Sequence, residues 1–89
     1  MIHLIEAGRS YKVFGVHGKL RIQIDDAYKE FVDESGVLFI RLEGNDVPFF
    51  IEHLEEDGDT LVKFKEVDSP EEARLLSNQL LYIDRERYR

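Results

Sequence analysis

The clearest pattern in the chain is a strict alternation of polar and apolar residues from Lys19 to Ile24. A period of two residues is typical of a β-strand with one buried face. The residues predicted to face a core are Leu20, Ile22 and Ile24. Lys19 and Arg21 then share the opposite face with Gln23, so the sequence predicts a strand whose outer side is basic.

Five further strands are predicted from short apolar runs that are separated by turn-forming residues. They span residues 11–16, 37–43, 47–54, 60–66 and 80–83. Residues 44–46 are expected to form the tight turn of one hairpin, and residues 57–59 that of a second. Such turns join antiparallel neighbours, whereas a parallel pair needs a connection of about a dozen residues or more. The sheet is therefore predicted to be antiparallel.

The strongest helix signal begins at Ser69. This serine can cap a helix, Pro70 suits the first helical position, and Glu72 can complete a capping box. Asn78 falls where the helix is expected to end, because asparagine readily adopts the left-handed conformation that ends helices. Apolar residues at helical spacing within residues 25–35 predict a single turn or a short helix there.

Together these elements predict an all-β fold, a six-stranded antiparallel β-barrel with one short helix before the last strand. Short strands at regular spacing favour a closed barrel over a flat sheet, and closure removes exposed edges. The predicted core consists of Val13, Leu20, Ile22, Ile24, Leu38, Ile40, Phe49, Ile51, Val62, Phe64, Ala73, Leu76, Leu81 and Ile83. A small barrel filled by these side chains has no room for a ligand chamber.

Length and composition restrict the class of protein. Eighty-nine residues, 43% apolar and 35% charged, suit one small domain. The absence of cysteine excludes a disulfide framework, a thiolate zinc site and a cysteine nucleophile. No apolar run approaches the ~20 residues needed to cross a bilayer, and Met1–Ile5 has neither the basic start nor the cleavage site of a signal peptide. We therefore expect a soluble, cytoplasmic monomer without membrane contact.

Charge is distributed unevenly along the chain, whose net charge is −7. Residues 1–24 contain four cations and one acid, a net charge of +3, so residues 25–89 have a net charge of −10. This balance argues against nucleic-acid binding by charge alone. The N-terminal segment is nevertheless a basic island. The residues predicted to bind a partner are Arg9, Lys12, Gly15, His17, Gly18, Lys19 and Arg21.

The loop Gly15–Gly18 within this island has two interpretations. Two glycines three positions apart permit a plain turn between strands. Because cations flank the loop and no acid occurs from residue 7 to residue 24, it could also present open amides and positive charge to an anionic partner. Phosphate of a structured RNA is one such partner, and a protein or a defined site on a ribonucleoprotein is the other.

No arrangement of residues predicts catalysis, a bound metal or a cofactor. Asp25 and Asp26 are adjacent, and adjacent carboxylates in a turn more often cap backbone amides than converge on a substrate or metal. The histidines, His3, His17 and His53, lack the spacing of metal ligands. The serines fit no nucleophile motif. We therefore expect a protein that is not an enzyme.

Several segments of the chain occur in the order and spacing of a known family. They are Gly8–Arg9, Gly15–Ile22, Asp25, Leu61–Phe64, Val67–Asp68, Pro70–Ala73 and Leu81–Ile83. In these segments the chain resembles the N-terminal domain of the RimM family of ribosome maturation factors, also described as 16S rRNA processing proteins. Phe14 stands where the family usually has histidine, and Asn78 where it usually has glycine. Asn78 suits the same helix end.

The resemblance implies a non-enzymatic binding module in late assembly of the 30S small ribosomal subunit, acting at its head region and supporting 16S rRNA processing. The implied partners are the immature small subunit, rRNA phosphate and ribosomal protein S-nineteen, the last mainly through a second, PRC-type barrel. Residues 1–84 would form the N-terminal barrel, of the type found in the second domain of translation elongation factors. Residues 85–89 would begin a linker to the second barrel, which is expected to be absent from this chain.

Two other functions stay open as alternatives. Similar barrels occur in flavin reductases and isomerases, so a small cofactor-binding enzyme that uses Asp25, Asp26 and His17 is one of them. A purely architectural domain, which orients the second barrel, is the other. The architectural alternative predicts that reversing the charge of the basic residues has no effect on binding.

Overall fold

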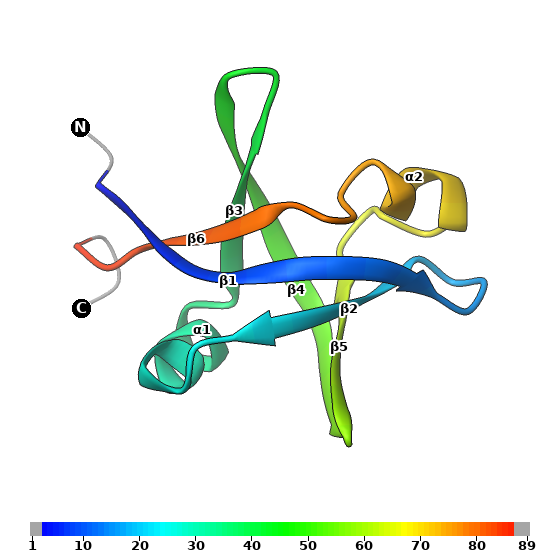
Figure 1. Cartoon of the computed structure of the whole chain (residues 1–89), viewed down its shortest axis with the longest axis horizontal. Coiled ribbons are helices and arrows are strands. Elements are labelled where there is room, and N and C mark those ends of the chain that lie inside the picture. The colour runs from blue at the N-terminus through cyan, green and yellow to red at the C-terminus, as the bar shows by residue number, and fades with distance from the viewer. Residues whose placement is uncertain (1–2, 87–89) are drawn as a thin grey trace.

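The structure contains six strands: β1 (Leu4–Phe14), β2 (Lys19–Ile24), β3 (Val37–Leu42), β4 (Asn45–Asp57), β5 (Asp59–Phe64) and β6 (Leu80–Asp84). They form a closed antiparallel barrel in the order β1-β2-β5-β4-β3-β6 (Figure 1). The predicted all-β, six-stranded antiparallel barrel is therefore confirmed. This computed structural model describes residues 3–86, so most of the predicted linker at residues 85–89 lies outside the described residues.

Strand β1 differs most from the sequence prediction. It begins at Leu4 and ends at Phe14, whereas the pattern predicts a strand at residues 11–16. Its first half pairs with β6 and its second half with β2. The register shifts between Glu6 and Gly8 in one pairing and between Ser10 and Val13 in the other. Because these bulges break the period of two, the sequence pattern does not reveal the full strand.

The β3–β4 hairpin turns at Glu43 and Gly44, whose φ angles are 50° and 82°. Leu42, which precedes the turn, pairs with Asn45, which follows it. Two central residues at positive φ are typical of a type I′ turn, whose twist matches that of antiparallel strands. The prediction of a turn at residues 44–46 was wrong, because a glutamate at positive φ is uncommon and is not a turn signal in the sequence.

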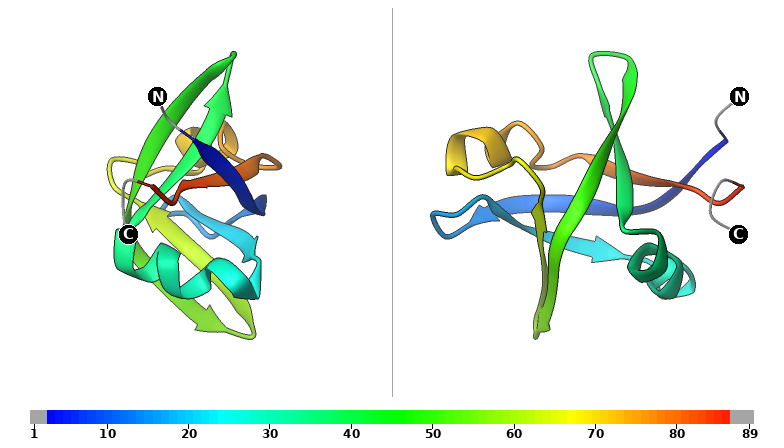
Figure 2. Two further views of the ribbon diagram at one scale, coloured as in Figure 1. Left: turned by 90° about the vertical axis from the view of Figure 1, so that its left-hand side faces the viewer. Right: turned by 180° about the vertical axis from the view of Figure 1, so that it is seen from behind.

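Strand β4 is the longest element, with thirteen residues, and it belongs to two hairpins. It exceeds the predicted range of 47–54 at both ends. The β3–β4 and β4–β5 hairpins extend from the barrel in opposite directions (Figures 1 and 2). The second turn lies at Gly58, whose φ is 80°, between the paired residues Asp57 and Asp59, as predicted.

The helices are short and lie at opposite ends of the barrel (Figures 1 and 2). Helix α1 (Lys29–Ser35) follows a 3₁₀ turn, η1 (Asp26–Tyr28), which confirms the short helix predicted in this region. Helix α2 (Pro70–Arg74) is the predicted helix before the last strand. Neither α1 nor α2, the α-helices of the described chain, is long and apolar enough to span a membrane.

The ends of α2 follow their sequence signals. The Ser69 hydroxyl accepts a hydrogen bond from the Glu72 amide at 3.2 Å and donates one to the Glu72 carboxylate at 3.0 Å, which confirms the capping box. The helix itself ends at Arg74, earlier than expected, and turn residues lead on to Asn78. Asn78 has a φ of 54°, the left-handed conformation that its residue type predicts.

The barrel interior is filled with aliphatic and aromatic side chains. Every predicted core residue is buried except Val13, Phe49 and Ile51, which are partly buried and pack against the core. The buried apolar residues that the sequence pattern did not reveal are Ala7, Val32, Val37, Phe39 and Val67. Val32 lies on α1 and Val67 follows β5, so both cover ends of the barrel that strand periodicity does not describe.

Ser10 fixes β1 against the segment between α2 and β6. Its side chain is fully buried, and its hydroxyl donates to the Leu76 carbonyl at 2.6 Å and accepts from the Gln79 amide at 2.9 Å. The Ser10 amide also donates to the Gln79 carbonyl at 2.8 Å. Ser10 therefore has a structural role that explains its presence in an otherwise apolar environment.

Gly8 and Gly18, both in segments that resemble the RimM pattern, lie where no side chain fits. A Cβ atom at Gly8 would lie 2.0 Å from the Gln23 carbonyl oxygen, and one at Gly18 would lie 2.3 Å from the Val67 carbonyl oxygen. Gly18 also has a φ of 91°. Gly15, at the other end of the loop, has a φ of 72° but open space around it.

We expect Gly18→Ala to destabilise the fold much more than Gly15→Ala. Both variants place alanine at positive φ, which costs roughly 1–2 kcal/mol, but only the first forces a Cβ against the backbone of Val67. Gly18→Ala should therefore lower the free energy of unfolding by about 3 kcal/mol or more. Urea denaturation with an unchanged m-value measures the difference. If Gly18→Ala and Gly15→Ala lower the free energy of unfolding equally, the close approach to Val67 does not exclude a side chain at residue 18.

We expect Ser10→Ala to lower the free energy of unfolding by about 2 kcal/mol, because it leaves the buried carbonyl of Leu76 and the half-buried amide of Gln79 without the Ser10 hydroxyl. Ser77→Ala is the matched control, since the Ser77 hydroxyl makes a similar bond to the Arg74 carbonyl but in an exposed position. Thermal or urea unfolding of the two variants compares them. If both variants are as stable as the parent chain, the hydrogen bonds of the Ser10 hydroxyl do not stabilise the fold.

Candidate functional site

The outer face of β1 and β2 contains most of the residues predicted to bind a partner. Arg9 pairs with Gln23 and Phe14 pairs with Lys19 in the antiparallel register. Directly opposed residues of antiparallel strands share a face, and the intervening Leu20 and other aliphatic residues of β2 are buried inside. The predicted alternation of β2 is therefore confirmed, and its polar side lies on the same surface as the exposed side chains of β1.

The bulge in β1 exposes two consecutive side chains on this surface. Ser10 pairs with Ile22 and Val13 with Leu20, so Tyr11 and Lys12 together lie opposite a single residue of β2. Both side chains are exposed instead of alternating between inside and outside. The Tyr11 hydroxyl donates to the Gln23 side-chain oxygen at 3.2 Å, which fixes the tyrosine on the outer side.

The sequence predicts a basic outer side for β2, but its cations are not free in the structure. The β4–β5 hairpin places an acid beside each of them. The Lys19 ammonium donates to the Glu55 carboxylate, and the Arg21 guanidinium lies 3.4 Å from the Asp59 carboxylate. The hydrogen bond from Lys19 lowers the pKa of Glu55 below its usual value. The Nε2 atom of His53 lies 3.3 Å from the same Glu55 carboxylate.

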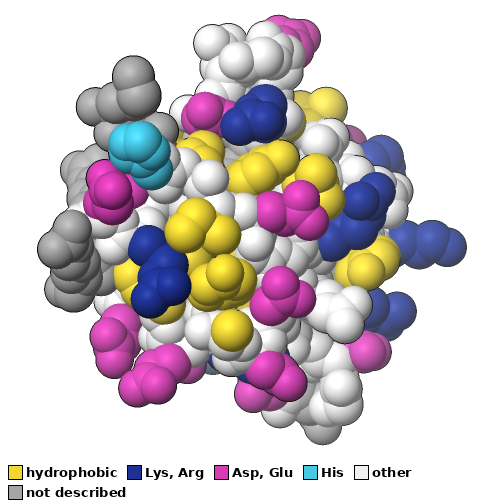
Figure 3. All heavy atoms as spheres, turned by 60° about the vertical axis from the view of Figure 1, so that its left-hand side comes forward, with side chains coloured by type: hydrophobic (Ala, Val, Ile, Leu, Met, Phe, Trp, Pro, Cys, Tyr) yellow, Lys and Arg dark blue, Asp and Glu magenta, His cyan; other side chains and the backbone are white. Residues whose placement is uncertain are grey.

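Arg9 and Lys12 differ from the cations of β2 in having no ion pair within residues 3–86. Both side chains are exposed on β1. Lys and Arg side chains gather along the right-hand edge of the face shown in Figure 3, while acidic side chains are scattered over the rest of it. On the outer face of β1 and β2, the cations without an ion pair are therefore Arg9 and Lys12. Elsewhere in the described chain, Lys65, Arg74 and Arg85 are also exposed without an ion pair.

The loop between β1 and β2 combines glycines with exposed apolar side chains. Gly15 and His17 are exposed, whereas Gly18 is buried against the backbone of Val67 and fixes the base of the loop. Val16 is also exposed, with 68% of its surface accessible.

Aromatic side chains complete this surface. Phe14 is 45% exposed and Tyr11 is 37% exposed. The Arg21 guanidinium lies 5.9 Å from the centre of the Phe14 ring, a cation–π contact. Sequence reasoning did not identify Tyr11 and Phe14 as site residues, although their positions among the cations of the basic island were the available signal.

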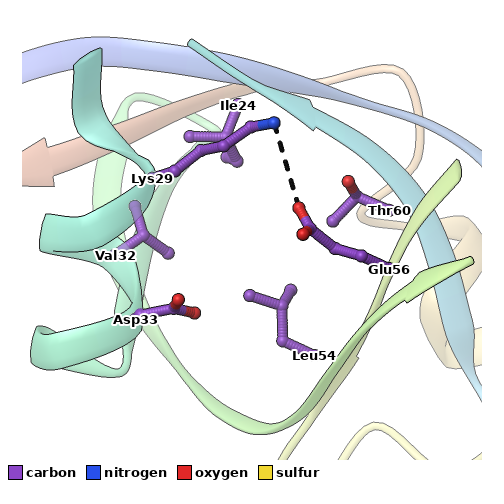
Figure 4. Close-up of a pocket in the computed structure, with 7 residues that line it drawn as sticks. All are labelled: Ile24, Lys29, Val32, Asp33, Leu54, Glu56 and Thr60. Atoms are coloured by element: carbon purple, nitrogen blue, oxygen red, sulfur yellow. Dashed lines mark ion pairs between the residues drawn. The ribbon is translucent and has the colours of Figure 1, made fainter. Parts of the chain in front are cut away.

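A separate hollow of about 260 Å³ lies between α1 and the β4–β5 hairpin, outside the barrel core (Figure 4). Lys29 and Glu56 point toward each other across it, with 3.9 Å between the ammonium and the carboxylate. A hydrogen bond to Asp26, 3.1 Å away, raises the pKa of Lys29, so this amine stays protonated near neutral pH and cannot act as a base. Asp33 and apolar residues complete the lining.

The residues of the enzyme alternative are not brought together. His17 precedes the N-terminal end of β2, whereas Asp25 and Asp26 follow its C-terminal end. A six-residue strand separates them by roughly 20 Å. Among the side chains that the structure describes, which exclude that of Asp57, no three from His, Asp or Glu are placed to hold a metal ion together.

Known proteins identify the family of this chain. Residues 5–88 match the model of the RimM N-terminal domain. Ribosome maturation factor RimM of Bacteroides thetaiotaomicron is 37% identical over 74 residues, which cover 81% of this chain and 41% of the relative. The same factor of Flavobacterium psychrophilum is 31% identical over 78 residues, covering 85% and 45%. The chain thus spans less than half the length of these relatives.

Solved structures share the fold. A crystal structure of the 16S ribosomal RNA processing protein RimM from Pseudomonas aeruginosa superimposes with a TM-score of 0.78 at 23% identity, covering 94% of this chain and 52% of that one. The solution structure of the N-terminal domain of RimM from Thermus thermophilus gives a TM-score of 0.73 at 23% identity, covering 91% and 88%. In sequence and in fold, the chain belongs to the RimM family and corresponds to its N-terminal domain.

Proposed function

We propose that this chain is a non-catalytic binding module for maturation of the small ribosomal subunit in the cytoplasm, and that the outer face of β1 and β2 faces the ribosome. The observation that supports this surface is the presence of two exposed cations, Arg9 and Lys12, that have no ion pair in the described part of an acidic chain. The names of the relatives support a role in ribosome maturation.

A binding role suits the chemistry better than catalysis. Arg9 and Lys12 supply positive charge at a surface, where phosphate or a carboxylate can reach them. Lys19 and Arg21 can join them if the anion of the partner replaces Glu55 and Asp59. The Arg21–Asp59 pair is exposed, and because exposed ion pairs are weak, its exchange has a small free-energy cost. The Lys19–Glu55 pair is part-buried and costs more to replace.

The finer assignment follows the family. We propose action in late 30S assembly at the head region, with support of 16S rRNA processing and with the immature subunit as partner. The loop residues Gly15 and His17 extend the proposed surface, and Gly18 holds the loop in place. Contact with ribosomal protein S-nineteen is assigned to a second, PRC-type barrel after a linker that begins at residues 85–89, and the module is proposed to act as a monomer.

Reversal of Arg9 and of Lys12 tests the surface. We expect Arg9→Glu and Lys12→Glu each to lower association of the 89-residue chain with purified immature small subunits by about tenfold, and to reduce the salt dependence by about one phosphate contact. Cosedimentation over a range of salt concentrations measures both quantities. Neither variant removes an ion pair within residues 3–86, so the fold should be unaffected.

Lys65→Glu is the matched control for this experiment. Lys65 is exposed, and its amide donates to the Phe50 carbonyl on β4, which is not a neighbour of β1 in the barrel. The control makes the same charge change and should bind as the parent chain does. Equal binding by all variants would reject the surface and favour the architectural alternative, and equal weakening would show that only net charge matters.

A further inference from the structure

We propose that the outer face of β1 and β2 binds unpaired RNA nucleotides, whose bases stack on Tyr11 and Phe14 while their phosphates contact Arg9 and Lys12. This inference rests on the proposed function and names the chemistry that the surface recognises. The ligand is single-stranded RNA, because a base inside a duplex is already stacked on its neighbours and cannot offer its face to a side chain.

The aromatic rings are the first observation behind the proposal. Tyr11 and Phe14 are 37% and 45% exposed, although aromatic side chains are among those that gain most from burial. Both lie on the outer side of β1, where the bulge places Tyr11 beside Lys12. Exposed aromatic rings interleaved with cations are typical of surfaces that bind single-stranded nucleic acids, since every base has a face that can stack.

The rings are also held in place before any ligand binds. Tyr11 donates a hydrogen bond to Gln23 on the neighbouring strand, and Arg21 lies over the ring of Phe14. Side chains fixed by such contacts lose less conformational freedom on binding than free ones. The Arg21 guanidinium can in addition stack with a base or contact a phosphate.

A hollow of about 380 Å³ adjoins the tyrosine and lies within the size range of small-molecule sites. Its polar lining includes Tyr11, Arg21, Gln23, Asp59 and Thr60. These groups include hydrogen-bond donors and acceptors, which are the partners that the edge of an unpaired base requires. The hollow therefore suits a base that is turned out of an RNA strand, and the cations that line it are Arg21 and Lys29.

The charge distribution favours RNA at this face and at no other exposed aromatic site of the described chain. Phe50 and Leu75 are also exposed, at 51% and 72%, and they line an apolar groove. That groove is flanked by Glu66 and Glu72, with Lys65 as its cation. That groove has one cation for two acids, whereas the rings of β1 lie among Arg9, Lys12 and Arg21. The hollow beside Tyr11 has the acids Asp26 and Asp59 but also the cations Arg21 and Lys29.

Direct binding of RNA to the 89-residue chain tests the proposal. The probe is a fluorescent single-stranded RNA of about ten nucleotides of mixed sequence, compared with the same strand annealed to its complement. We expect tighter binding of the single strand. Tyr11→Leu and Phe14→Leu should each weaken it by about tenfold, since leucine keeps an apolar side chain but has no ring. Tyr11→Phe keeps the ring but loses the hydrogen bond to Gln23, so it should weaken binding much less than Tyr11→Leu does.

Phe50→Leu is the matched control, the same substitution at an exposed aromatic of the acidic groove, and should leave RNA affinity unchanged. Equal effects of Phe14→Leu and Phe50→Leu, or equal affinity for single strand and duplex, would overturn the stacking proposal. If Arg9→Glu weakens subunit binding while Tyr11→Leu does not, the proposed function stands and stacking is rejected. Subunit binding without any RNA binding would identify a protein partner and overturn the proposal as well.

Discussion

The barrel closes with β1 as the strand whose two pairings, to β2 and to β6, both contain a register shift. A small closed barrel requires strongly bent and tilted strands, and β1 meets this requirement with a bulge in each pairing. Ser10, fully buried beside one bulge, ties the strand to the segment after α2. The same bulge turns both Tyr11 and Lys12 outward. The surface proposed to bind a partner is thus a direct result of how the barrel closes.

The acidic character of the chain shapes this surface as much as its cations do. The β4–β5 hairpin extends far enough to place Glu55 and Asp59 beside the cations of β2. Lys19 and Arg21 are thereby compensated in the free protein, so on this face the cations without an ion pair are Arg9 and Lys12 of β1. Since residues 25–89 have a net charge of −10, polyanions that approach from other sides are repelled over the screening length.

Local signals in the sequence were enough to predict most of the fold. The alternation in β2, the turn at Gly58 and the capping box at Ser69 each depend on residues close together in the chain, and all three are confirmed. The start of β1 was missed because bulges interrupt its period, and the first hairpin turn was misplaced because Glu43 adopts positive φ. The ion pairs of Lys19 and Arg21 join residues far apart in the sequence. The charge count of residues 1–24 could not reveal them, so it suggested more unpaired cations on β2 than the structure has.

The combination of a repelling acidic body with stacking side chains has a consequence for selectivity. Phosphate contacts are the same on every RNA, so cations alone would not separate an unfinished ribosomal subunit from a finished one. Unpaired bases differ between the two states, because RNA folding stacks and pairs them. A surface that requires a free base face at Tyr11 or Phe14 loses its ligand once that base is paired. Under the proposed stacking, release would need no catalytic step in the protein, since the folding of the RNA would remove the binding site.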